Sequence, residues 1–190
     1  MSQTNLFAAK EKKRYSRVQH GGTTGKGHRK LERPLSRKNW IHLVLKSEKA
    51  KGKLSFLTAK NQILIKRIIN EKAKKFGVTV ADQANVGNHL HLKIKISTRE
   101  SFQKFLKAIT TLIARSVTGA KRGRPFGKFW QGLAFSRVLK SRTEELNLNG
   151  YMIANRLEAA TSYQAREKFL QKFNAWVYRQ RKLGIASTSD

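Results

Sequence analysis

Apolar and polar residues alternate in four short segments of the chain, a period that predicts β-strands. The segments are "NWIHLVLKS" (39–47), "VTVADQAN" (78–85), "NHLHLKIKIS" (88–97) and "GLAFSRVLKS" (132–141). Because successive side chains of a strand point to opposite faces, the leucines and isoleucines of the third segment share one face. Its other face carries His89, His91, Lys93 and Lys95. We therefore expect a sheet with one apolar face and one basic face that bears histidines.

Between these strands, apolar residues recur at steps of three and four, which predicts amphipathic helices. The first helix is expected at Thr58–Phe76, ended by Gly77. Ser97 with Glu100 has the spacing of a capping box and predicts where the second helix begins. Two more helices are expected, one from Thr143 to Ala160 and one with a basic outer face over residues 162–183.

The order strand, helix, strand, strand, helix, strand matches the ferredoxin-like split βαβ arrangement of the α+β class. It places an antiparallel sheet under two helices on one face, so the histidines should project from the uncovered face. The helix at 143–160 and a C-terminal helix are additions. We divide the chain into a basic, flexible arm (1–38), a main domain (39–160) and a basic C-terminal helix and tail (161–190).

Charge narrows the classes of function. Lys and Arg total 41 against 11 acidic residues, so the formal charge is +30 and the expected partner is a polyanion, above all nucleic acid. Only two Asp occur, which disfavours a nuclease with an aspartate cluster around paired metals, and the absence of Cys excludes thiolate sites. Without an apolar run long enough to cross a bilayer, a cytoplasmic protein is expected. A ribosomal-type or chromatin-type binder without chemistry remains open.

Candidate chemistry begins with the histidine pair. Two imidazoles one residue apart on a strand lie parallel and close enough to share a divalent ion. Tyr151 and Asn155 fall four residues apart on one helix face. An amide oxygen can complete a metal site, and a tyrosine hydroxyl can attack a phosphorus that a metal has polarised. Simple packing of Tyr151 against the core is the alternative.

A loop at 119–131, "GAKRGRPFGKFWQ", interleaves basic residues with aromatic residues, a composition suited to phosphate contact and to stacking on unpaired nucleobases. Phe129 and Trp130 are equally compatible with anchoring the loop on the core. From this loop, the strand and the arm we select the expected DNA-binding residues Lys93, Lys95, Arg122, Arg124, Lys128, Arg33, Arg37 and Lys38.

Together these residues resemble a known family, the HUH single-strand nucleases, and within it the single-tyrosine transposases of insertion sequences and the REP-associated tyrosine transposases. "NHLHLKI" resembles the family's His-hydrophobic-His strand, "FWQ" its segment before the last strand, and "YMIANRLEA" its helix with Tyr followed by Asn. The three motifs occur in the family's order, and the resemblance spans residues 33–160.

This resemblance implies a metal-dependent nicking and strand-transfer enzyme that acts on single-stranded or hairpin DNA. It implies Tyr151 as nucleophile and His89, His91 and Asn155 as ligands of Mg²⁺ or Mn²⁺. A small-molecule cofactor and a membrane are not expected, and a homodimer is left open. The implied location is the bacterial cytoplasm, near the nucleoid. The alternative is a domesticated DNA- or RNA-binding protein that keeps the fold without cleaving.

Overall fold

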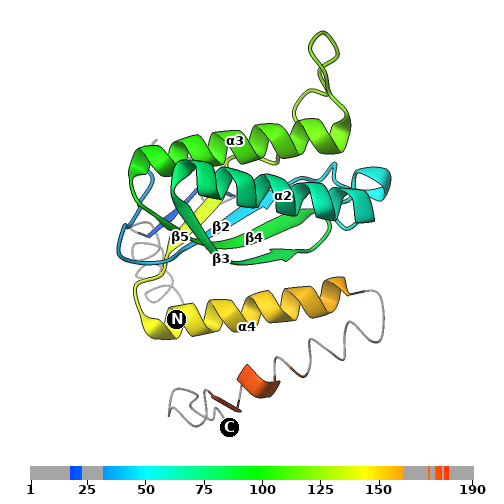
Figure 1. The fold of residues 1–190 in the computed structure, drawn as a ribbon. Helices are drawn as coiled ribbons and strands as arrows, with labels where there is room; N and C mark the ends of the chain where they lie inside the picture. Colours follow the sequence, from blue (N-terminus) through cyan, green and yellow to red (C-terminus); the bar gives the residue numbers. More distant parts are fainter. Residues whose placement is uncertain (1–17, 23–31, 161–170, 172–173, 177, 180–190) are drawn as a thin grey trace, which may run out of the picture.

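The computed structural model describes residues 18–22, 32–160, 171, 174–176 and 178–179 (Figure 1). None of the helices in these ranges is long and apolar enough to cross a membrane. The elements are β1 (Gln19–His20), β2 (Ile41–Lys46), the 3₁₀ turn η2 (Gly52–Leu54), α2 (Ala59–Phe76), β3 (Val78–Asn85), β4 (His89–Ile96), α3 (Arg99–Thr118), β5 (Phe135–Val138) and α4 (Arg142–Ala159).

The strands form one antiparallel sheet in the order β1-β5-β2-β4-β3. The expected ferredoxin-like arrangement is confirmed, with β1 as an added edge strand. Gln19–His20, expected in a flexible arm, form an edge strand of this sheet, and next to it the N–H of Val138 donates to the carbonyl of Val18 at 2.9 Å. The other arm residues up to 31 lie outside the described ranges.

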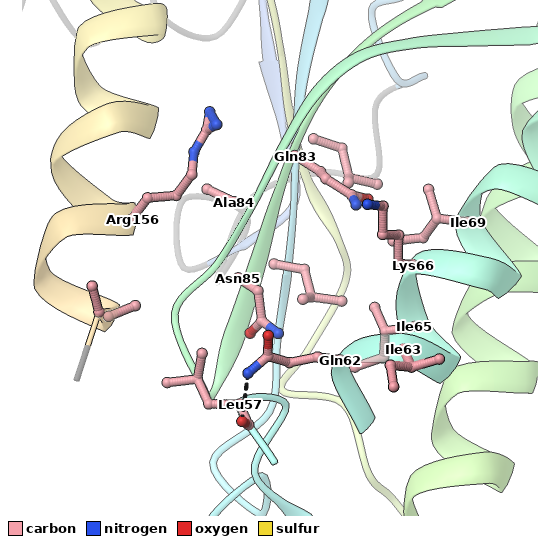
Figure 2. Close-up of a pocket in the computed structure, with 14 residues that line it drawn as sticks. Leu57, Gln62, Ile63, Ile65, Lys66, Ile69, Gln83, Ala84, Asn85 and Arg156 are labelled. Atoms are coloured by element: carbon pink, nitrogen blue, oxygen red, sulfur yellow. Dashed lines mark hydrogen bonds between the residues drawn. The ribbon is translucent and has the colours of Figure 1, made fainter. Parts of the chain in front are cut away.

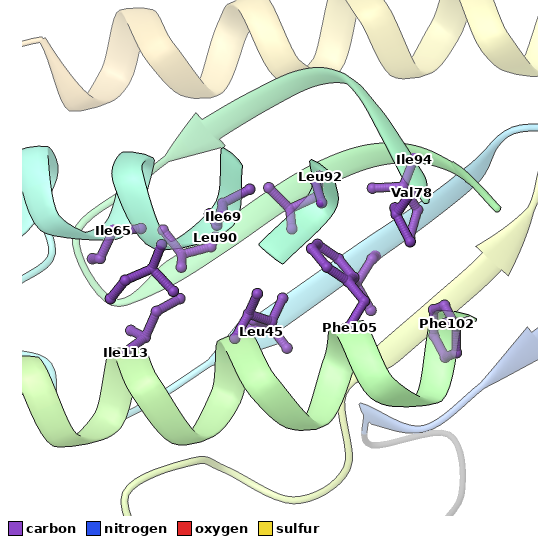
Figure 3. Close-up of a cluster of buried hydrophobic side chains, with 14 of the residues drawn as sticks. Leu45, Ile65, Ile69, Val78, Leu90, Leu92, Ile94, Phe102, Phe105 and Ile113 are labelled. Atoms are coloured by element: carbon purple, nitrogen blue, oxygen red, sulfur yellow. The ribbon is translucent and has the colours of Figure 1, made fainter. Parts of the chain in front are cut away.

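The main core lies between the sheet and the pair α2 and α3, which cover one face (Figure 1). Leu92 of β4, Phe105 and Ile113 of α3 are completely buried, and Figure 3 shows them interlocked with side chains from α2. The predicted alternation is thus correct for this face, because every second residue of β2 and β4 enters the core.

The opposite face is not open, contrary to expectation. α4 lies across it on the side of β3 (Figure 1), and a second, smaller apolar cluster joins Met152 and Leu148 of α4 to Ala84 of β3 and to Leu139. The helix was expected, and the resemblance implied that Tyr151 and Asn155 lie near the histidines, but the sequence did not predict that the helix covers this face of the sheet. Its placement explains why the middle of β4 is buried on both faces.

Helix ends follow local hydrogen-bonding rules. Thr58 caps α2 by accepting the N–H of Asn61, and Gly77 ends it in the left-handed region with φ of 64°. The capping box expected at Ser97 was wrong by one residue, since Thr98 caps α3 by accepting the N–H of Ser101. Glu100 instead pairs with Lys104 at 2.7 Å.

The predicted C-terminal helix falls mostly outside the described residues, although 174–176 and 178–179 are helical. Trp176 packs on α4 at Gly150, where an added Cβ would lie 2.9 Å from the indole ring. The C-terminal segment therefore contacts the helix that carries Tyr151.

Phe105→Ala tests the assigned core. Removing a fully buried aromatic ring should lower the free energy of unfolding by about 3–5 kcal/mol, because transfer and cavity terms add. Ile63→Ala is the matched control, since this α2 side chain is 69% exposed and should change stability by less than about 0.5 kcal/mol. Urea denaturation followed by circular dichroism measures both, and equal effects would contradict the assigned packing.

Candidate active site

Three histidines meet on the sheet face that α4 covers. His89 and His91 follow one another on the same face of β4, with ring centroids 4.8 Å apart. His42 comes from the neighbouring strand β2, whose register pairs Val44 with His91 and His42 with Lys93. His42 is thus the diagonal neighbour of His91, and long side chains can bridge the distance between two diagonal positions.

Each of these three rings has a hydrogen-bond contact. His42 Nε2 and His91 Nδ1 lie 3.1 Å apart, with the ring planes inclined by 17°. His89 Nδ1 lies 2.5 Å from Oδ1 of Asn88, the preceding residue. The remaining nitrogen of His91, Nε2, is buried and has no hydrogen-bond partner in the described part of the chain.

Burial keeps these imidazoles neutral. It lowers the pKa of His91 to about 3, with smaller contributions from His42 and His89. It lowers the pKa of His42 to about 4, helped by the positive charge of Arg137. Burial and the charge of Lys46 also lower the pKa of His89. At neutral pH each ring therefore keeps a nitrogen lone pair, which a metal ligand requires.

Tyr151 reaches the same place from α4. Its ring centroid lies 5.3 Å from that of His91 and 6.3 Å from that of His42, edge to face in both cases. The side chain is nonetheless 49% exposed. Tyr151 is therefore packed against the histidines on one side and exposed to solvent on the other.

Asn155 lies one turn further along α4 and is buried. Its side-chain N–H group donates to the carbonyl of Tyr151 at 2.8 Å, so the amide oxygen is the end that stays available as a ligand. This hydrogen bond thus fixes the orientation of the Asn155 amide relative to the backbone of Tyr151.

Charged residues hold α4 over the sheet. Lys93, only 6% exposed, donates to Asn149 at 3.1 Å and pairs with Glu145 at 3.5 Å, both on α4. Its ammonium group also lies 5.2 Å from the ring centroid of Trp40. Toward the other end of the helix, Arg156 pairs with Asp82 of β3. These contacts orient the helix that presents Tyr151.

The side chains at this site can be compared with the ligands that a metal ion requires. No group of three His, Asp or Glu side chains in the described ranges is arranged to hold one. The buried Nε2 of His91, which has no partner in the described residues, the adjacent His89 and the amide oxygen of Asn155 are nevertheless nitrogen and oxygen donors of the types that suit Mn²⁺ or Mg²⁺. The set depends on an amide oxygen as its third member.

The predicted DNA-binding residues separate into two groups. Arg33 donates to Ser136 at 2.6 Å and to the carbonyl of Ala134 at 2.9 Å, and Lys93 is engaged beneath α4. Both are occupied within the fold, so neither presents a free cation to DNA in this structure. The remaining six are exposed: Lys95, Arg37, Lys38, Arg122, Arg124 and Lys128.

The basic loop does not join the histidine site. It extends from the end of α3, in the layer on the far side of the sheet from α4 (Figure 1). Phe129 is buried in the main core and Trp130 donates to the carbonyl of Thr110 at 2.9 Å, so both anchor the loop. Phe126 is 39% exposed. The basic residues Arg122 and Arg124 therefore form a second surface, separate from the histidine site.

A cavity of about 490 Å³ lies between α2, β3 and the C-terminal end of α4 (Figure 2). Its wall includes Gln62, Gln83, Asn85 and Arg156, but neither Tyr151 nor any histidine. A second cavity, of about 670 Å³, adjoins the basic loop and is lined by Arg115 and Phe126. Neither coincides with the His and Tyr cluster, where the reactive groups are.

Sequence reasoning missed His42 as a member of the site. Alternation places it on the face opposite Ile41, Leu43 and Leu45, but only the register of β2 against β4 brings it to His91. The burial of Lys93 was missed for a related reason, since the position of α4 is not encoded in local periodicity.

No protein-family model matches the sequence, and no curated protein matches it. Among solved structures, a REP-associated tyrosine transposase bound to a REP hairpin aligns with a TM-score of 0.52 and 12% identity, over 73% of this chain and 78% of that one. A Deinococcus radiodurans R1 protein, provisionally named a transposase, aligns with a TM-score of 0.42 and 19% identity, over 67% and 98% of the two chains. The chain therefore has the fold of a REP-associated tyrosine transposase, in agreement with its three sequence motifs.

Proposed function

We propose that this protein is a transposase-like enzyme that cuts and rejoins hairpin-forming single-stranded DNA through a covalent bond to Tyr151. One observation carries the proposal: a half-exposed phenol lies 5.3 Å, centroid to centroid, from a buried histidine whose Nε2 has no partner in the described residues. A nucleophile beside metal-binding groups is the arrangement that phosphoryl transfer requires.

His89, His91 and Asn155 would hold Mg²⁺ or Mn²⁺, which when bound withdraws charge from a non-bridging oxygen of the scissile phosphate. The hydrogen bond from Asn155 to the carbonyl of Tyr151 orients the amide. The ion pairs of Lys93 and Arg156 keep the phenol at the histidines. Positioning of the nucleophile is thus the main task of α4.

The chemical step conserves phosphoester bonds. Tyr151 Oη forms a bond to phosphorus, the bond from phosphorus to the 3′ oxygen breaks, and the 5′ phosphate stays on the protein. The proton of the phenol leaves to water, which reaches the half-exposed side chain, and the departing 3′ oxygen takes one up. Because attack by a 3′-hydroxyl reverses the step, strands can be rejoined without a nucleotide cofactor.

Hairpin DNA is the proposed substrate. The solved relative in fold is described as bound to a REP hairpin, and the +30 charge of this chain favours a polyanion. Lys95 is exposed on the histidine-bearing face of β4, which supports its assignment to the cut strand. Arg122, Arg124 and Lys128 on the separate loop surface are assigned to the hairpin stem or its unpaired bases.

Tyr151→Phe should abolish the covalent adduct while DNA binding is retained, because the ring stays and only the attacking oxygen is lost. Tyr178→Phe is the matched control, since Tyr178 is also helical and exposed and should leave the adduct intact. Labelled hairpins are incubated with Mn²⁺, and label that migrates with denatured protein is measured.

An adduct that persists in Tyr151→Phe would sink the proposed nucleophile. Hairpin binding by the wild type without any adduct, in Mn²⁺ and in Mg²⁺, would instead favour a non-catalytic DNA-binding protein.

His89→Ala should remove Mn²⁺ binding and adduct formation together, with little loss of fold, because this ring lies at the start of β4 and is only half-buried. His91→Ala should do the same but lower the melting temperature more, since His91 is 3% exposed. Calorimetric titration with Mn²⁺, melting curves and the adduct assay measure the three effects. Full activity in excess chelator would exclude the metal role.

Hairpin affinity should fall steeply with salt. If the exposed Lys and Arg side chains neutralise about six to eight phosphates of a single strand, log affinity against log salt should have a slope of roughly −4 to −6. The double variant Arg122→Ala with Arg124→Ala should reduce the magnitude of that slope by about 1.4 if both contact unpaired DNA, at about 0.7 for each lost contact, and by about 1.8 if both contact the duplex stem, at about 0.9 each. Fluorescence anisotropy at several salt concentrations measures it, and a slope near zero would rule out phosphate binding.

A further inference from the structure

We propose that His42 is a positioning residue that selects the tautomer of His91 in which Nε2 is unprotonated and faces the metal. This inference rests on the proposed function, since it concerns the same metal site. It concerns a residue that lies on another strand and belongs to none of the three sequence motifs.

The contact between the two rings has the geometry of a hydrogen bond. The facing nitrogens lie 3.1 Å apart while the ring centroids lie 5.3 Å apart, so both nitrogens lie close to the line that joins the rings. With only 17° between the ring planes, an N–H on one ring points along the plane at the lone pair of the other. If both rings bound one shared ion, the two nitrogens would instead point at the ion and not at each other.

This bond leaves two arrangements of protons. A neutral imidazole carries one N–H, so one ring donates and the other accepts. If His42 donates, the proton of His91 must lie on Nε2, a buried atom without a partner in the described residues, and a buried N–H would be left unsatisfied. If His42 accepts, His91 keeps its proton on Nδ1 and presents a lone pair at Nε2.

The second arrangement matches the way histidine ligands are held in known metal sites, where the nitrogen that does not bind the metal donates to a fixed acceptor. Here the acceptor is itself held. His42 is fixed by the β2 register, opposite Lys93 and Arg137, and the rings of Phe135 and Tyr151 lie edge-on at 6.2 and 6.3 Å. His42 therefore acts on the metal through His91, while it also contacts the nucleophile helix.

Two substitutions at this position distinguish the effect of the hydrogen-bond acceptor from the effect of side-chain size. His42→Gln keeps a side-chain oxygen near the position of Nε2, whereas His42→Met has similar size without a comparable acceptor. In the metal-free full chain at pH 7, two-bond ¹H–¹⁵N NMR should find the proton of His91 on Nδ1 in the wild type and in His42→Gln. In His42→Met it should find a mixture of tautomers.

Mn²⁺ affinity, measured by calorimetry, should fall about 10- to 100-fold in His42→Met and be largely rescued in His42→Gln. A wild-type His91 protonated at Nε2, or a His42→Met variant with unchanged tautomer and unchanged affinity, would overturn the inference. Loss of Mn²⁺ in His42→Gln as complete as in His91→Ala would also overturn it, because His42 would then be a direct ligand.

The two readouts distinguish this inference from the proposed function. If the wild type binds no Mn²⁺, the metal site fails, while the metal-free NMR result still decides whether His42 selects the tautomer. If His42→Met does not fold, as judged by its melting curve, the wild-type tautomer and the His42→Gln variant decide the question alone.

Discussion

The packing of α4 on the sheet face opposite α2 and α3 is the contact on which the candidate site depends. Met152 and Leu148 fix the helix on Ala84 through a small apolar cluster. The cluster is small, and the contacts of the buried Lys93 with Asn149 and with the partly buried Glu145 add to it. Without these partners on α4 the ammonium group of Lys93 would be a buried charge without compensation, so the helix is favoured in this one position.

That position gives the histidine face its chemistry. Without α4 the imidazoles would be solvated and the phenol distant. With it, His91 is buried, its pKa falls to about 3, its Nε2 has no partner among the described residues, and its ring lies 5.3 Å from that of Tyr151, centroid to centroid. Burial is thus the physical cause of the neutral imidazoles, while the proposed nucleophile Tyr151 stays half-exposed, as access for a strand of DNA would require.

Local patterns predicted the elements well, because alternation and helical spacing report which face is buried. β3 was expected with its observed bounds, and Thr58 and Gly77 end α2 as their capping preferences require. Packing between distant segments was not predictable in this way. The strand pairing that brings His42 to His91, and the burial of Lys93, depend on sheet register and on where α4 settles. A basic residue such as Arg33 likewise predicts DNA contact from charge alone, although its guanidinium is bound to Ser136.

The central claim is that the histidine pair and Tyr151 form one site, and paramagnetic broadening by Mn²⁺ tests it without reference to catalysis. The chain has four tyrosines, and the ring signals of Tyr151 can be assigned as those missing from Tyr151→Phe. Substoichiometric Mn²⁺ should broaden these signals strongly in the wild type and leave them sharp in the variant with both His89→Ala and His91→Ala. Sharp Tyr151 signals in the Mn²⁺-loaded wild type, or equal broadening in the double variant, would contradict the account.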